Sequence, residues 1–90
     1  MASDVTVFDL GWLSRATTVR VNLDVMANVR LMTKANIDAY AKRIAYRMIG
    51  GVATIRPFDI TIPVDGHWYV AVDTEGLTAS RFQAEVTIVA

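Results

Sequence analysis

Most of the chain alternates between apolar and polar positions with a period of two, the pattern of strands that bury one face. The clearest case is residues 17–25, where Val19, Val21 and Leu23 alternate with Arg20 and Asn22. Residues 5–10 are apolar on both faces and are typical of a covered strand. The alternation recurs in four later segments, residues 28–33, 58–64, 68–73 and 81–89. Candidate strands separated by turn signals predict an antiparallel sandwich or a small barrel.

One segment between residues 33 and 51 breaks the strand period. Thr33 or Asn36 is placed to cap the start of a helix, and Gly50-Gly51 is placed to end it. We therefore expect a helix of about two to four turns after the third strand, with residues 46–49 as an alternative strand that enters a Gly-Gly turn. Its apolar residues fall at helical spacing: Ile37, Tyr40, Ala41, Ile44 and Met48.

The segment TIPVDGHWYVAVD, residues 61–73, holds the chain's single histidine. If it forms a hairpin, a three-residue loop with Gly66 in the left-handed bulge position aligns Ile62 with Trp68 and keeps both apolar rows together. The alternative is a chain that crosses between the sheets at Asp65-Gly66, as in jelly rolls. Both arrangements place Trp68 inside and His67 outside.

Length and composition restrict the class of protein. Ninety residues allow one domain, residues 1–90, and we expect a mainly β, jelly-roll-like antiparallel sandwich of about six to eight strands with one short helix. The hydrophobic fraction is 53%, but no apolar run approaches the ~18 residues that span a bilayer. The N-terminus lacks a basic, apolar leader, and cysteine is absent, so we expect a cytoplasmic protein without disulfides or thiolate metal sites.

Charge is balanced overall but uneven along the chain. Nine basic residues meet nine acidic ones, whereas a general nucleic-acid binder carries a basic excess, so nucleic acid is not an expected partner. Low net charge favours self-association. A basic stretch runs from Lys34 to Arg56, and the C-terminal third is acidic. The basic stretch is either a solvated face attracted to the acidic third or an anion-binding patch at Lys42, Arg43 and Arg47.

Candidate chemistry is sparse. A lone histidine cannot form a multi-histidine metal site, and no carboxylates fall at a recognised ligand spacing, so we expect no metal or cofactor. An enzymatic alternative is a small hydrolase or lyase that uses His67 with Asp65 or Asp73 as its orienting carboxylate.

Aromatic residues suggest binding instead. His67, Tyr69 and Thr61 share an outer face by strand parity, with Arg30 as a possible neighbour, and such a platform can anchor a protein partner. The alternative is that Tyr69 packs under the helix while its hydroxyl reaches water.

Several short segments together form a recognisable pattern: Asp9-Leu10-Gly11, residues 28–32, Tyr46 with Gly50-Gly51, and, most specific, the GHW stretch within residues 63–73. With these segments the chain resembles a bacterial family of small proteins, domain-of-unknown-function family 1883. The spacing departs from the family pattern where three residues separate Tyr46 from Gly50. The resemblance covers nearly the whole chain and implies a jelly-roll-like sandwich, but no established activity and no functional residue.

Taken together, the residues and the resemblance predict a non-enzymatic binding or assembly module of a bacterial cytoplasm. Its expected partner is a protein or a second copy of the chain, rather than a small molecule or a membrane. The alternatives are the small hydrolase or lyase and a purely structural subunit of a homo-oligomer.

Overall fold

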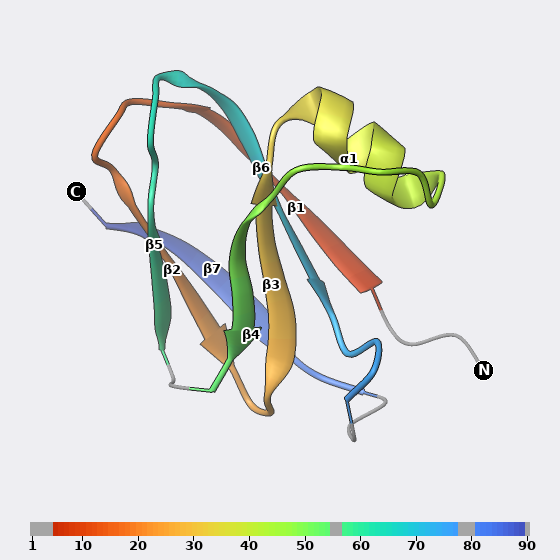
Figure 1. Ribbon diagram of the computed structural model, residues 1–90. Helices are drawn as coiled ribbons and strands as arrows, with labels where there is room; N and C mark the ends of the chain where they lie inside the picture. Colours follow the sequence, from red (N-terminus) through yellow and green to blue (C-terminus); the bar gives the residue numbers. More distant parts are fainter. Residues whose placement is uncertain (1–4, 55–56, 78–80, 90) are drawn as a thin grey trace.

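Two antiparallel sheets and one helix make up the computed structural model, which describes residues 5–54, 57–77 and 81–89 (Figure 1). Arg56 of the predicted basic stretch lies outside these ranges. One sheet has the strand order β1 (Val5–Leu13), β6 (Gly66–Asp73), β3 (Ala27–Met32) and β4 (Ile49–Ala53). The other has the order β5 (Phe58–Thr61), β2 (Thr18–Leu23) and β7 (Ala84–Val89). The helix, α1 (Lys34–Ala41), follows the third strand. The predicted mainly β sandwich, with a short helix at this place, is confirmed.

The core lies between the sheets and consists of the rows that the alternation predicted. Val19 and Val21 of β2, Val29 of β3, and Val70 and Val72 of β6 are completely buried. Each such side chain contributes about 1.5–3 kcal/mol relative to an exposed one. The repeated two-residue period therefore determines which face of each strand turns inward.

The outer face of β1 departs from the prediction of a covered strand. Val5 and Val7 are about half exposed, and Trp12 is 70% exposed. The reason is that α1 packs over β3 and β6, where Ile37 joins a small cluster with Met32. Because β1 is the edge strand beside β6, its outer side chains stay in contact with solvent.

The helix is shorter than its apolar spacing predicted. It ends at Ala41, because Arg43 adopts a left-handed conformation with φ of 59°. The Ile44 N–H then donates to the Ala39 carbonyl at 3.0 Å, which closes the last turn in the manner of a Schellman motif. At the start, Thr33 occupies the N-cap position without a side-chain capping bond. Ile44 and Met48 therefore lie beyond the helix, and the helical assignment of these two residues was wrong.

Gly50 and Gly51 do not form the predicted turn or helix end. Both lie within β4, paired with Arg30 and Val29 of β3. Gly50 has φ of 130°, and a Cβ atom built on it would fall 2.2 Å from the Val29 carbonyl oxygen. Glycine is required at this position because the two backbones approach closely.

We expect Gly50→Ala to lower the free energy of unfolding by about 1–3 kcal/mol, because the new methyl group collides with the β3 backbone and the residue is held at positive φ. The matched control is Gly51→Ala, which also has positive φ but meets no atom within 4 Å. Urea denaturation of both variants measures the difference. Equal losses would show that the close approach to Val29 contributes nothing.

The segment that contains the histidine crosses between the sheets. β5 and β6 belong to different sheets, so the hairpin and its left-handed Gly66 were wrong, and the alternative of a chain that crosses between the sheets is correct. The Ile62 N–H donates to the Thr17 carbonyl at 2.8 Å, and the Trp68 indole N–H donates to the Val64 carbonyl at 3.0 Å. These bonds hold the crossing at both ends. As predicted, Trp68 is buried and the neighbouring His67 is exposed.

Candidate functional site

The outer face of the four-stranded sheet has two open ends, one on each side of α1. The helix packs over the middle of the face, where Ile37 contacts a cluster that includes Met32 and Ala71. In the register of β1 with β6, Trp12 opposes His67 at one end, and Val5 opposes Asp73 at the other. The two ends carry different chemistry.

The first end is an aromatic ledge, made of Asp9, Trp12, His67 and Tyr69. The rings of His67 and Tyr69 stack with their centroids 4.9 Å apart and their planes inclined by 11°. His67 Nε2 lies 2.6 Å from Asp9 Oδ1. Trp12 stands beside this pair and is largely exposed. Tyr69 also packs against the cluster under α1, as expected if this side chain lies beneath the helix.

A β-bulge puts Trp12 on the ledge. The register between β1 and β6 shifts between Asp9 and Gly11, where Gly11 has φ of 71°. Its N–H donates to Asp9 Oδ1 at 2.9 Å. A one-residue shift inverts the parity of all later side chains, so Trp12 faces outward with His67 while Leu13 turns toward the core. The Gly11 N–H, followed by the His67 ring, lowers the pKa of Asp9 below its ordinary value.

The structure separates the four residues of the predicted binding surface. His67 and Tyr69 lie on the ledge, but Thr61 lies in the other sheet, opposite Thr18 of β2. Arg30 of β3 opposes Ala71 of β6, toward the end of the outer face that is away from the ledge. Sequence reasoning missed Trp12 because parity does not reveal a bulge. The one available signal was Gly11 two residues after Asp9.

The second end contains a buried carboxylate, Asp73, which is fully enclosed. Its Oδ1 accepts from the Asn28 amide at 2.7 Å and from the Glu75 N–H at 3.0 Å. Its Oδ2 accepts from the Arg30 guanidinium and from the Tyr40 hydroxyl, the latter at 2.5 Å. We call Asn28, Arg30, Tyr40 and Asp73 the Asp73 network. It ties α1 to β3 and β6.

The electrostatics of this network keep its phenol protonated. Burial, and then the bond to the Asp73 carboxylate, raise the pKa of Tyr40 well above its ordinary value. The Arg30 guanidinium lies over the Tyr40 ring, 5.4 Å from its centroid, and its Nε donates to the Tyr46 hydroxyl at 3.1 Å. Arg30 is therefore fixed in orientation by groups from two sides.

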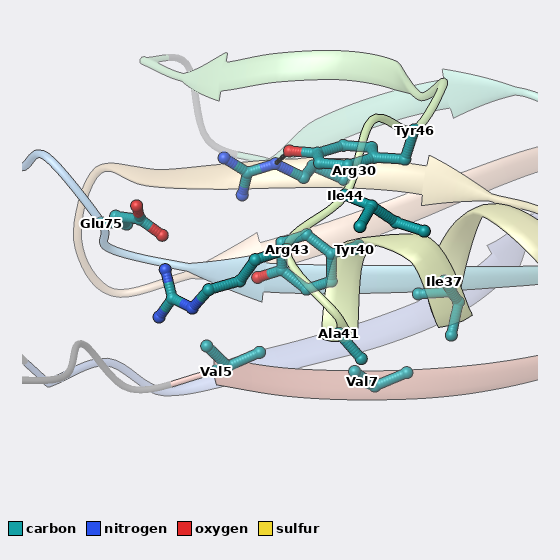
Figure 2. Close-up of a pocket in the computed structure, with 10 residues that line it drawn as sticks. All are labelled: Val5, Val7, Arg30, Ile37, Tyr40, Ala41, Arg43, Ile44, Tyr46 and Glu75. Carbon is teal, nitrogen blue, oxygen red and sulfur yellow. Dashed lines mark hydrogen bonds between the residues drawn. The ribbon is translucent and has the colours of Figure 1, made fainter.

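A hollow of about 430 Å³ opens beside the Asp73 network (Figure 2). Val5 and Val7 of β1 form one wall, and Ile44 lies across from them in the segment after α1. Arg30, Tyr40, Tyr46, Arg43 and Glu75 supply its polar lining.

Of the predicted anion-binding residues, only Arg43 lines the hollow. Lys42 and Arg47 are exposed on the same segment and do not line it. The Arg47 N–H donates to the Asn36 side chain at 2.8 Å. The structure thus brings Arg43 together with Arg30, which the sequence assigned to a different surface.

The carboxylates predicted to orient His67 are bonded elsewhere. Asp65 accepts from the Arg15 N–H at 2.6 Å, and Asp73 is held within its own network. His67 contacts Asp9 instead, on an exposed face. Among the residues that the structure describes, no three His, Asp or Glu side chains are grouped to hold a metal ion, and no helix is long and apolar enough to cross a membrane.

Comparison with known protein families matches residues 4–90 to the family described as Domain of unknown function (DUF1883). Comparison with curated proteins and with solved structures gives no match. The matched range contains both ends of the outer face. The family description states no activity.

Proposed function

The chain belongs to the DUF1883 family, a domain of unknown function, and we propose that it is a non-enzymatic binding module whose aromatic ledge contacts a protein partner. The observation that carries the proposal is the exposure of Trp12 beside the stacked His67 and Tyr69 rings. We place its action in the bacterial cytoplasm, as the sequence predicts.

An exposed tryptophan on a rigid sheet is suited to anchoring a partner. Tryptophan and tyrosine supply a large contact area with few rotatable bonds, and they are enriched where interfaces gain most of their energy. The backbone at Trp12 is paired in the ladder opposite His67, and the bulge at Gly11 directs the side chain outward. Asp9 and His67 add hydrogen-bonding groups at the rim.

The surroundings of His67 support binding rather than hydrolysis. The ring is about half exposed, and its carboxylate partner Asp9 is more exposed still. A general base is most effective in a water-excluding pocket, whereas this pair stands on an open face. An exposed face with an aromatic anchor is typical of an interaction surface.

The proposal is tested by photocrosslinking in cells that make the chain natively. A photoreactive phenylalanine analogue placed at His67 should give a discrete protein adduct, because it replaces one ring of the ledge with another. The same analogue at Thr61, which is exposed on the other sheet, is the matched control. Adding Trp12→Ala to the His67 variant should remove the adduct.

The outcomes separate the possible partners. An adduct at twice the mass of the chain identifies a second copy and favours a homo-oligomer subunit. An adduct with a different protein supports the proposed module. The same products from positions 67 and 61, or products that persist after Trp12→Ala, would show that the ledge is not the contact surface.

A further inference from the structure

We propose that the hollow beside α1 binds a small zwitterion with an apolar body, the class of a free aliphatic amino acid. This site lies at the Val5 and Asp73 end of the outer face, away from the aromatic ledge. It does not depend on the proposed function of the ledge. Three parts of the lining determine this ligand class: a pair of guanidinium groups, a carboxylate, and an aliphatic wall.

The guanidinium groups belong to Arg30 and Arg43. Arg30 is held by its hydrogen bonds to Asp73 and Tyr46. The N–H groups of its guanidinium that do not take part in these bonds are therefore held in place beside the hollow. The side chain of Arg43 makes no hydrogen bond or ion pair with any residue of the described part. Figure 2 shows both guanidinium groups toward the same end of the hollow. Two such groups suit the planar, bidentate recognition of a carboxylate.

The backbone at Arg43 strengthens this assignment. A left-handed conformation is unfavourable for arginine, and glycine is the usual residue at this position of a helix end. Residues held in sparsely populated conformations cluster at ligand-binding sites, where the surrounding structure maintains them. Arg43 begins the segment that carries Ile44 across from β1, and its side chain lines the hollow.

Glu75 supplies the opposite charge. Its side chain is exposed and has no hydrogen bond or ion pair with the other described residues, although its backbone bonds to Asp73 and Asn28. The pair of Arg30 and Asp73 is neutral, so one cation, Arg43, and one anion, Glu75, remain. A ligand with only a negative charge would be repelled by Glu75, and a ligand with only a positive charge would be repelled by Arg43. A zwitterion satisfies both, with its carboxylate toward the guanidinium groups and its ammonium group toward Glu75.

The aliphatic wall selects the body of the ligand. Val5, Val7 and Ile44 are 52%, 48% and 59% exposed, and all three line the same hollow. Covering them removes apolar surface from water and is favourable. The hollow, at about 430 Å³, is toward the small end of the range for small-molecule sites. A branched side chain of the size of leucine matches this wall.

The test is a nuclear magnetic resonance titration of the isotope-labelled chain with L-leucine and three trimmed probes. Leucinamide lacks the carboxylate, isocaproate lacks the ammonium group, and glycine lacks the apolar body. Leucine should cause saturable shifts of the backbone amides of Val7, Arg43 and Ile44. Each trimmed probe should bind about tenfold more weakly or worse, because each leaves one part of the site unpaired.

Two charge-removing variants check the assignment of each group. Arg43→Gln should weaken leucine but leave the weak binding of leucinamide unchanged. Glu75→Gln should weaken leucine but leave isocaproate unchanged or improved. Lys42→Gln, which removes an adjacent cation outside the hollow, is the control and should leave leucine binding unchanged.

Three results would overturn the proposal. The first is the absence of saturable shifts with leucine. The second is isocaproate or leucinamide binding as tightly as leucine, which would show that only one charge is recognised. The third is an equal loss from Lys42→Gln and Arg43→Gln, which would show attraction by the general charge of the segment rather than by the hollow.

Discussion

Asp73→Ala is expected to lower the free energy of unfolding by about 3–5 kcal/mol. The carboxylate is fully buried and accepts four hydrogen bonds, from Asn28, Glu75, Arg30 and Tyr40. Its removal leaves the Arg30 guanidinium, whose side chain is 16% exposed, without a counter-charge. A buried charge that loses its partner keeps the full penalty of leaving water, so the loss exceeds that of an ordinary hydrogen bond.

The matched control is Asp59→Ala, which removes the partner of Arg20 on the other sheet. That pair also joins a guanidinium and a carboxylate through two hydrogen bonds, each 3.0 Å long, but both side chains are about 40% exposed. Water replaces the lost partner there, so we expect only a small fraction of the Asp73 effect. Urea denaturation of the two variants measures the comparison. Similar losses would show that the Asp73 network does not hold α1 to the sheet.

Tyr40→Phe separates the helix tether from the ion pair. It removes one hydrogen bond to Asp73 and keeps the ring that lies beside Arg30. Its effect should be smaller than that of Asp73→Ala, because Arg30 and Asp73 still neutralise each other. If Tyr40→Phe is as damaging as Asp73→Ala, the phenol rather than the ion pair stabilises this end of the sheet.

The part of the fold that could be predicted is the part that the two-residue alternation of apolar and polar positions determines. Rows such as Val19 and Val21 show which face of a strand is apolar, and that face must turn inward. The alternation does not show which strands are neighbours in a sheet. For this reason Trp68 was correctly placed inside, although its strand pairs with β1 and β3 rather than with the preceding strand. The helix end was also unpredictable, because Arg43 takes a conformation that sequence rules reserve for glycine.

The candidate site was predictable only in part, for the same reasons. His67 and Tyr69 follow parity and lie on the outer face. Trp12 joins them through a bulge, and one extra residue inverts the parity on which the prediction depends. Asp73 reads as an ordinary polar residue at the end of a strand. Its partners come from a neighbouring strand and from the helix, so only tertiary pairing reveals that it is buried.

Trp68→Ala is expected to lower the free energy of unfolding by about 3–5 kcal/mol, as deletion of a large buried aromatic side chain does. Trp68 is 6% exposed within the main core, and its indole bond to Val64 closes the crossing between the sheets. Trp12→Ala also removes a tryptophan side chain, but from the solvent side of the adjacent strand β1. His67→Ala removes the exposed side chain that precedes Trp68 in β6. Both should change the free energy of unfolding by no more than about 0.5 kcal/mol.

The two tryptophans also give each variant its own spectroscopic check. Trp12→Ala leaves only the buried indole, so its emission should lie at short wavelength and shift on unfolding. Trp68→Ala leaves only the exposed indole, so its emission should resemble that of tryptophan in water even before denaturant is added. If Trp68→Ala does not fold, Trp68→Phe keeps most of the ring volume, loses the bond to Val64 and should remain measurable. If His67→Ala is as damaging as Trp68→Ala, the histidine is buried and the register of β6 is shifted by one residue. The aromatic ledge would then not exist, and the binding role proposed for it would be wrong.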